Sequence, residues 1–350
     1  MTDLPVKATP RLAANRARVA VLWFAAGLLV LAALPWLVNS YLLLLATTVL
    51  IWTVGLLGLN LITGNAGLIS LGYSGFLAVG AYANAILQLD AGMPALLAIP
   101  AGGVVAALFG LLIGLPSLRL SGLYLAITTL AFAVILNSVI VEGGDFTRGS
   151  EGIGVPQLSV GGFSLDTSFR FYYVCLAIAA FFTFVTRNLE RSYFGRSLLA
   201  LREYETAAVV SGVNATRLKL SAFVISSFYI GVSGALFSHL IRYLNVDNFS
   251  PLIGIEALAM IIAGGLGSFV GSILGVIFLT GLSEVLRMLI SASDGPLAAL
   301  MSTGAVEIRG LIYGLGIILF LRWEPAGLLG LWRLFSARLS RKRDEPESGP

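Results

Sequence analysis

Five polar side chains stand in long apolar stretches of this 350-residue sequence, where they could hydrogen-bond a polar solute. Polar side chains are costly in lipid, so each should meet protein or a water-filled path. Four of them fall in the glycine-rich stretch 64–87, where helical spacing puts them on one face. The fifth lies in the stretch 117–144. Lining of a solute path and simple hydrogen bonding between helices both remain open for these residues: Ser70, Tyr73, Ser74, Asn84 and Asn137.

The stretch 188–219 carries a second candidate site, which would bind a protein partner. Two acidic residues precede a pair of alanines there, and Gly212 suits the left-handed stop of a short helix. A helix that exposes small side chains can lie in a groove of another protein. The alternative is a solvated amphipathic connector. The candidate docking residues are Glu203, Glu205, Ala207, Ala208 and Gly212.

Four charged residues are expected near the outer membrane surface, where they could form an outer gate or a docking site. Two of them are three residues apart and could pair on one helix. The alternative is that these side chains only extend from the helix ends into water. The four are Glu142, Glu256, Glu284 and Arg287.

The remaining composition excludes most covalent chemistry on this chain. Its one cysteine, Cys175, forbids an intrachain disulfide, and its one histidine, His239, leaves no His/Cys metal cluster. None of the three lysines follows a glycine in a phosphate-binding G-x-x-x-x-G-K-[ST] pattern, and the Gly264–Gly267 cluster lacks nucleotide-loop spacing. We therefore expect no catalytic residue, bound metal or cofactor, and any ATP hydrolysis must come from a partner.

These residues must be positioned by membrane helices, because the composition leaves no other class. Apolar residues make up 57% of the chain and charged residues 11%, against about 25% charged residues in a soluble domain. Such a chain cannot cover a water-exposed surface with polar groups. The sequence predicts an all-α polytopic membrane protein and excludes a cytosolic enzyme, a secreted disulfide scaffold and a disordered chain.

About 20 apolar residues span a bilayer, and ten stretches meet or approach this length. The stretch 254–267 is short and glycine-rich, so a re-entrant or broken segment is the alternative there. The prediction is ten transmembrane helices, with eight to ten allowed. The expected spans are 19–38, 41–61, 66–88, 94–114, 121–141, 171–187, 219–242, 254–267, 269–290 and 305–321.

Basic residues favour the cytoplasmic side of a membrane, and their placement here is uneven. The arm 1–18 holds four, the loop 187–219 six, the tail 322–350 six and the turn after 114 one, together 17 of the 22. If the chain starts in the cytoplasm and crosses the membrane ten times, all four segments lie in the cytoplasm. Both termini are therefore expected there. The net charge of +4 thus reflects topology, and no nucleic-acid partner is expected. A single transmembrane domain should fill 19–321.

Several strings in this order resemble the LivM-like permease subunits of branched-chain amino-acid ABC importers. The resemblance covers about residues 50–290, with the last span and basic tail also similar. Glu205, Ala207, Ala208 and Gly212 match the E-x-A-A-x-x-x-G coupling motif of that family. The matching strings are GNAGLISLGYSGFLAVGAY, SGLYLAITTLAF, TRGSEGI, FGRSLLALREYETAAVVSGVNATRLKLSAFVIS and IAGGLGSFVGSILGV.

The resemblance implies an inner-membrane subunit of a bacterial ATP-driven importer. Its implied partners are a second, homologous permease, two ATPase subunits that bind ATP and Mg, a periplasmic substrate-binding protein and membrane lipid. Residues 203–212 would transmit closure of the ATPases, and the solute would be a branched-chain or related amino acid. Tyr73 stands where many relatives have histidine, so the resemblance does not fix the identity of the solute. Relatives in this group also carry urea or short amides.

Two other classes compete with an ATP-driven importer. An ion-driven secondary transporter is expected to hold a carboxylate at mid-membrane. Glu142, Glu256 and Glu284 map near the outer ends of their spans instead. A passive channel would not need the docking segment 188–219.

Overall fold

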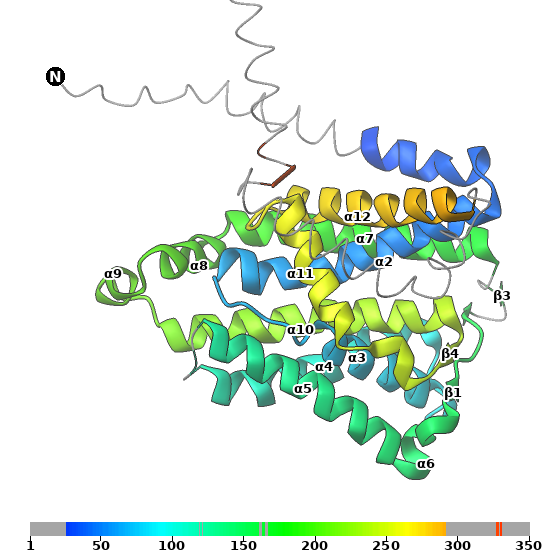
Figure 1. Cartoon of the computed structure of the whole chain (residues 1–350), viewed down its shortest axis with the longest axis horizontal. Coiled ribbons are helices and arrows are strands. Elements are labelled where there is room, and N and C mark those ends of the chain that lie inside the picture. Colours follow the sequence, from blue (N-terminus) through cyan, green and yellow to red (C-terminus); the bar gives the residue numbers. More distant parts are fainter. Residues whose placement is uncertain are drawn as a thin grey trace, which may run out of the picture.

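The structure is a computed structural model that describes residues 26–118, 120, 122–160, 163–164, 167–291, 327–328 and 330 (Figure 1). Six of its helices are long and apolar enough to cross a membrane. They are α2 (Ser40–Asn60) with its π-helical extension η1 (Leu61–Asn65), α4 (Ala95–Ser117), α5 (Leu123–Glu142), α7 (Ser168–Arg191), α10 (Ala215–Ile241), and α11 (Leu252–Gly264) with the 3-10 turn η3 (Val246–Phe249).

Three further helices accompany these six: one over Ala26–Leu37, α3 (Tyr73–Leu89) and α12 (Phe269–Ser291). An all-α membrane protein is therefore confirmed. The count of ten spans stays a prediction, because the expected span 305–321 lies outside the described residues, as do the arm 1–18 and nearly all of the tail 322–350.

The remaining elements sit at the two ends of the long helices (Figure 1). Helices α8 (Tyr193–Glu203) and α9 (Glu205–Val210) lie at one end. At the other end, β1 (Ile153–Gly154) pairs antiparallel with β4 (Tyr243–Leu244). The short elements near it are α6 (Gly144–Thr147), η2 (Gly149–Glu151), and the paired strands β2 (Ser159–Val160) and β3 (Phe163–Ser164).

Helix α10 is the centre of the packing and contacts α2, α3 and α4 along its length. Glycines allow the backbones to approach closely: a Cβ built at Gly80 of α3 would lie 2.1 Å from the carbonyl oxygen of Gly231, and one at Gly234 would lie 2.0 Å from that of Leu77. Small residues at such contacts are typical of helices packed within membranes. The polar face of α3 is thereby brought against α10.

The expected span 66–88 is the largest difference from the sequence analysis. Residues 66–72 are not helical, and α3 begins only at Tyr73. The backbone N–H of Leu71 donates to Thr129 Oγ1 of α5 at 2.9 Å, and its carbonyl oxygen lies against Gly254 of α11. Irregular backbone at membrane depth is tolerated where it is surrounded by protein, and α5 and α11 provide those surroundings.

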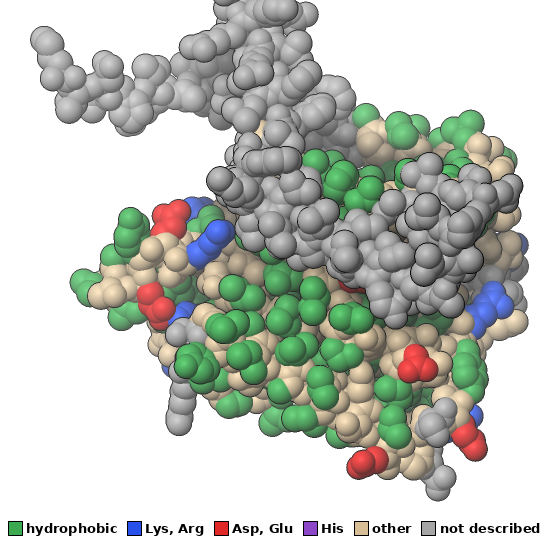
Figure 2. All heavy atoms as spheres, viewed as in Figure 1, with side chains coloured by type: hydrophobic (Ala, Val, Ile, Leu, Met, Phe, Trp, Pro, Cys, Tyr) green, Lys and Arg blue, Asp and Glu red, His purple; other side chains and the backbone are tan. Residues whose placement is uncertain are grey.

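The surface follows the same organisation. Figure 2 shows hydrophobic side chains along the flank of α5 and its neighbours, whereas the coloured charged side chains gather toward the two ends. Exposed apolar residues on that flank include Leu123, Ile127, Ile135 and Val139 of α5. This is the distribution expected when lipid or another membrane subunit surrounds the flank.

Candidate coupling surface and transmembrane path

The coupling segment, residues 188–219, folds into two short helices that project from the ends of α7 and α10 (Figure 1). Ser192 begins α8 by accepting a hydrogen bond from the Gly195 N–H. Tyr204 is not helical and separates α8 from α9. Helix α9 ends at Val210, and Gly212 has a φ of +90°, so the helix stop expected at Gly212 is observed.

Helix α9 exposes apolar side chains at the tip of the molecule. Val210 is 84% exposed and Tyr204 is 75% exposed, and Ala207 is exposed between them. Ala208 is buried against the chain itself. Figure 2 shows green side chains at this end, with acidic and basic side chains beside them. Of the alanine pair, Ala207 is thus the one that can face a partner.

The acidic residues of the coupling segment have different environments. Glu203 is exposed at the end of α8. Glu205 begins α9 and forms an ion pair with Lys219 of α10, at 2.6 Å between Oε1 and Nζ. This pair ties the start of α9 to the first turns of α10. Sequence patterns do not predict this pair, because no helical periodicity relates two residues separated by 14 positions and a turn.

Most candidate path residues are buried inside this chain. Ser70 lies before α3 rather than on its helical face, and its Oγ accepts a long hydrogen bond from the Gly72 N–H. Tyr73 is fully buried and stacks on Trp52 of α2, with ring centroids 5.5 Å apart. Ser74 is also fully buried, and its Oγ has no hydrogen-bond partner among the described residues. These residues share an interior that the helices of this chain enclose.

Asn84 belongs to a buried polar network between α3 and α10. Its Nδ2 donates to Ser238 Oγ at 2.9 Å and contacts His239 Nε2 at 3.2 Å. Gln88 Nε2 donates to Asn84 Oδ1 at 3.0 Å and also contacts His239 Nε2 at 3.2 Å. Amide nitrogens only donate, so Nε2 of the imidazole must accept and carry no proton. The partners of Asn84 on α10 lie about 150 positions away in sequence, so the sequence alone could not predict the network.

Asn137 has a different setting on α5. It is half-buried, and its Nδ2 donates to the Phe249 carbonyl oxygen of η3 at 3.3 Å. Its buried Oδ1 has no hydrogen-bond partner within the described part of the chain. Ser138 and Val139, which follow it in α5, are exposed on the flank of the molecule, whereas Leu136 before it is buried. The structure therefore separates Asn137 from the enclosed residues of α3.

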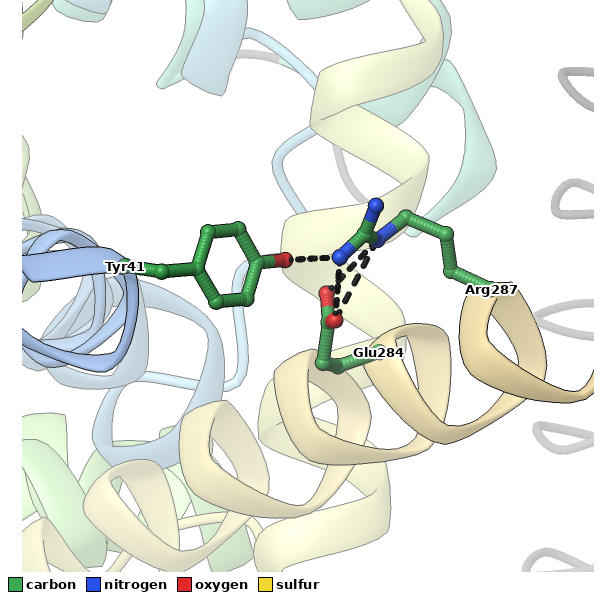
Figure 3. A network of polar contacts seen from close by, with 3 residues as sticks. All are labelled: Tyr41, Glu284 and Arg287. Carbon is green, nitrogen blue, oxygen red and sulfur yellow. Dashed lines mark hydrogen bonds and ion pairs between the residues drawn. The ribbon is translucent and has the colours of Figure 1, made fainter. Parts of the chain in front are cut away.

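The structure joins two of the four outer charged residues. Arg287 Nη2 lies 2.7 Å from Glu284 Oε1 and 2.6 Å from the Tyr41 hydroxyl, so the ion pair connects α12 with the first turn of α2 (Figure 3). Glu256 is half-buried on α11. Glu142 is exposed at the end of α5, on the opposite side of the molecule from α12 (Figure 1). The four residues do not form one cluster.

Apolar helices of membrane-spanning length, polar side chains buried between them and a pair of exposed short helices at one end are features expected of a membrane transport subunit. The chain belongs to the family of branched-chain amino acid transport system permease components, whose family model matches residues 41–321. The resemblance drawn from the motifs is confirmed, and with it the expectation of a transport permease in the inner membrane.

The chain is 32% identical over 335 residues to the high-affinity branched-chain amino acid transport system permease protein LivM of Salmonella typhimurium, covering 89% of this chain and 75% of that protein. The same values hold for LivM of Escherichia coli K12. A probable LivM of Methanocaldococcus jannaschii is 25% identical over 240 residues, covering 65% of this chain and 66% of that protein. No solved structure matches this chain.

Proposed function

We propose that this chain forms the translocation path for branched-chain or related amino acids in an ATP-driven importer. The observation that carries the coupling half of this proposal is the exposed tip of α9, with Tyr204, Ala207 and Val210 on its surface. A lipid-embedded subunit gains nothing by exposing apolar side chains at a polar end unless a partner covers them. Similarity to LivM over most of the chain supports the choice of solute.

The partners follow from this role. A second, homologous permease pairs with this chain in the membrane, and lipid surrounds the remaining flank. Two ATPase subunits bind ATP and Mg and dock on the coupling segment, while a periplasmic binding protein delivers the solute to the opposite end. This chain binds no cofactor and performs no covalent chemistry. Its coupling segment faces the cytoplasm, as do both termini.

The mechanism is alternating access driven from the cytoplasmic end. Closure of the ATPases on ATP displaces α9, and the Glu205–Lys219 ion pair and the Asn214 cap of α10 join that displacement to the central helix. Helix α10 packs against α2, α3 and α4, so its movement changes the packing around the polar interior. Asn137 is half-buried beside the exposed Ser138 and Val139 of α5, at the edge of the flank where a path between two permeases would run.

Two substitutions test the coupling surface. Ala207→Trp adds a bulky ring to an exposed position, which the chain itself tolerates but a docked partner does not. Gly212→Val forces a β-branched residue into the left-handed region, at a cost of roughly 1–2 kcal/mol. Both should leave the helices inserted, reduce co-purification of the ATPase and uncouple ATP hydrolysis from transport. Ala91→Trp, at an exposed turn of the opposite end, is the matched control.

The same preparation tests the solute. Proteoliposomes that hold the complete complex should take up radiolabelled leucine, and unlabelled isoleucine and valine should compete while urea and acetamide do not. Competition by urea or acetamide alone would replace the amino-acid assignment with the permease for urea or short amides. Normal co-purification and coupling in both bulky variants would make the coupling segment a solvated connector.

A further inference from the structure

Two glycine-containing connections meet beneath the coupling segment. One joins α2 to α3 through η1 and residues 66–72, and the other joins α11 to α12 through residues 265–268. Asn60, the last residue of α2, accepts at Oδ1 a hydrogen bond from the Gly267 N–H at 2.9 Å, which holds the start of the first connection against the second. The contact is close: a Cβ built at Gly64 would lie 2.5 Å from the Gly267 nitrogen.

Arg202, in the last turn of α8, lies across this junction. Its Nη1 donates to the Gly64 carbonyl oxygen. A Cβ built at Gly67 would lie 2.9 Å from Arg202 Cγ, and one at Gly267 would lie 3.2 Å from Nη1. The side chain therefore touches both connections, with its stem against one and its guanidinium between them. A hydrogen bond from a charged donor is stronger than a neutral one.

Helix α8 lies between α9 and the membrane helices, so a displacement of α9 is passed to Arg202. Leu198 and Leu201 are buried, and α8 packs against α7, η1 and α10. Only Tyr204 separates α8 from α9, so Arg202 lies three residues before the start of the exposed helix. Glu190, at the end of α7, lies beside the Asn65 side chain and the Phe269 backbone, which adds α7 to the same junction.

The two connections lead to helices that the proposed mechanism must move. Residues 66–72 continue into α3, which carries Tyr73, Ser74 and Asn84. The turn 265–268 continues into α12, whose far part carries the Glu284–Arg287 pair. Helix α10 receives movement directly from the coupling segment and can pass it to α3 by packing, but neither α3 nor α12 follows the coupling segment in the chain. A side chain that touches both connections is a more direct link to these two helices.

We propose that Arg202 is a positioning residue that transmits movement of the coupling segment to α3 and α12 through the glycine junction. The proposal rests on the coupling role proposed above for residues 203–212. It assigns Arg202 no contact with the solute or with the ATPase. Loss of the guanidinium should leave the ATPase docked and active while the membrane helices no longer respond.

The test uses the complete complex in proteoliposomes and three variants. Arg202→Ala removes the link, and Arg202→Lys keeps a charged donor that can still reach one carbonyl oxygen. Gly67→Ala displaces the arginine stem and strains a backbone with φ of +70°, without changing charge. Arg196→Ala is the control, since Arg196 is also on α8 but donates to Arg191 at the α7–α8 turn.

We expect Arg202→Ala and Gly67→Ala to lower the solute transported per ATP at least tenfold, with ATPase co-purification and the KM for ATP within twofold of wild type. Arg202→Lys should recover at least a third of the wild-type ratio, and Arg196→Ala should match wild type. An unchanged ratio in Arg202→Ala overturns the proposal, as does a lysine variant no better than alanine. Loss of the ATPase from Arg202→Ala also overturns it, because Arg202 would then hold the docking surface. Failure of the wild-type chain to co-purify the ATPase would instead contradict the coupling role itself.

Discussion

Val210 offers the sharpest measure of how much the tip of α9 contributes to ATPase binding. Its side chain is 84% exposed. Fully burying a valine stabilises by about 1.5–3 kcal/mol, so covering the exposed part with a partner is worth about 2 kcal/mol. Val210→Ser removes most of that gain. Since 1.4 kcal/mol is a tenfold change in affinity, the Kd for the ATPase should rise roughly 30-fold.

The assay is equilibrium binding of a fluorescent ATPase subunit to the permease pair in nanodiscs. Val141→Ser is the matched control, because Val141 is also exposed but lies near the end of α5 beside α6 (Figure 1). The control should leave the Kd within twofold of wild type. A change below threefold for Val210→Ser would show that the tip of α9 is not covered in the complex, and the docking surface would have to be sought elsewhere.

Two further predictions concern the polar network and the orientation. Asn84→Ala removes one side-chain partner each from Ser238, Gln88 and His239, and it should lower the free energy of unfolding by about 1–2 kcal/mol, measured by denaturant titration in mixed micelles. Thr48→Ala removes only a bond to its own helix and should change the free energy of unfolding by less than about 0.5 kcal/mol. In whole cells, an impermeant maleimide should label Tyr243→Cys from outside and Val210→Cys only after lysis, with the native, buried Cys175 as an unreactive background; labelling of Val210→Cys in intact cells would reverse the topology.

The features that the sequence predicted well depend on local chemistry. Gly212 ends α9 because a left-handed residue is needed there, and glycine adopts that conformation without steric cost. The apolar stretch 219–242 became α10 because its length and composition leave no alternative in lipid. The glycine cluster around Gly265 separates α11 from α12 for the same local reason, a backbone with positive φ.

The features that the sequence missed depend on contacts between distant segments. The break before Tyr73 is stabilised by Thr129 of α5, which accepts a hydrogen bond from the Leu71 N–H. The apolar periodicity of the sequence cannot predict a bond between these distant residues. Helical periodicity was enough to place Asn84 on a polar face. Its hydrogen-bond partners on α10 could be identified only from the folded structure. The burial of Ser74 is another feature that the sequence did not show. Because Ser74 is fully buried, Ser74→Trp would disrupt packing whether or not the residue lines a path, so this substitution cannot separate path lining from hydrogen bonding between helices.

The proposed function requires that ATP hydrolysis by a partner, and no ion gradient, drives solute import through this chain. The direct measurement is uptake of radiolabelled leucine by proteoliposomes that contain both permeases, the ATPases and the binding protein, with ionophores present to collapse every ion gradient. We predict uptake against a concentration gradient that requires enclosed ATP and Mg and persists with the ionophores. Uptake that the ionophores abolish, or that proceeds without ATP under an imposed proton or sodium gradient, would contradict the account.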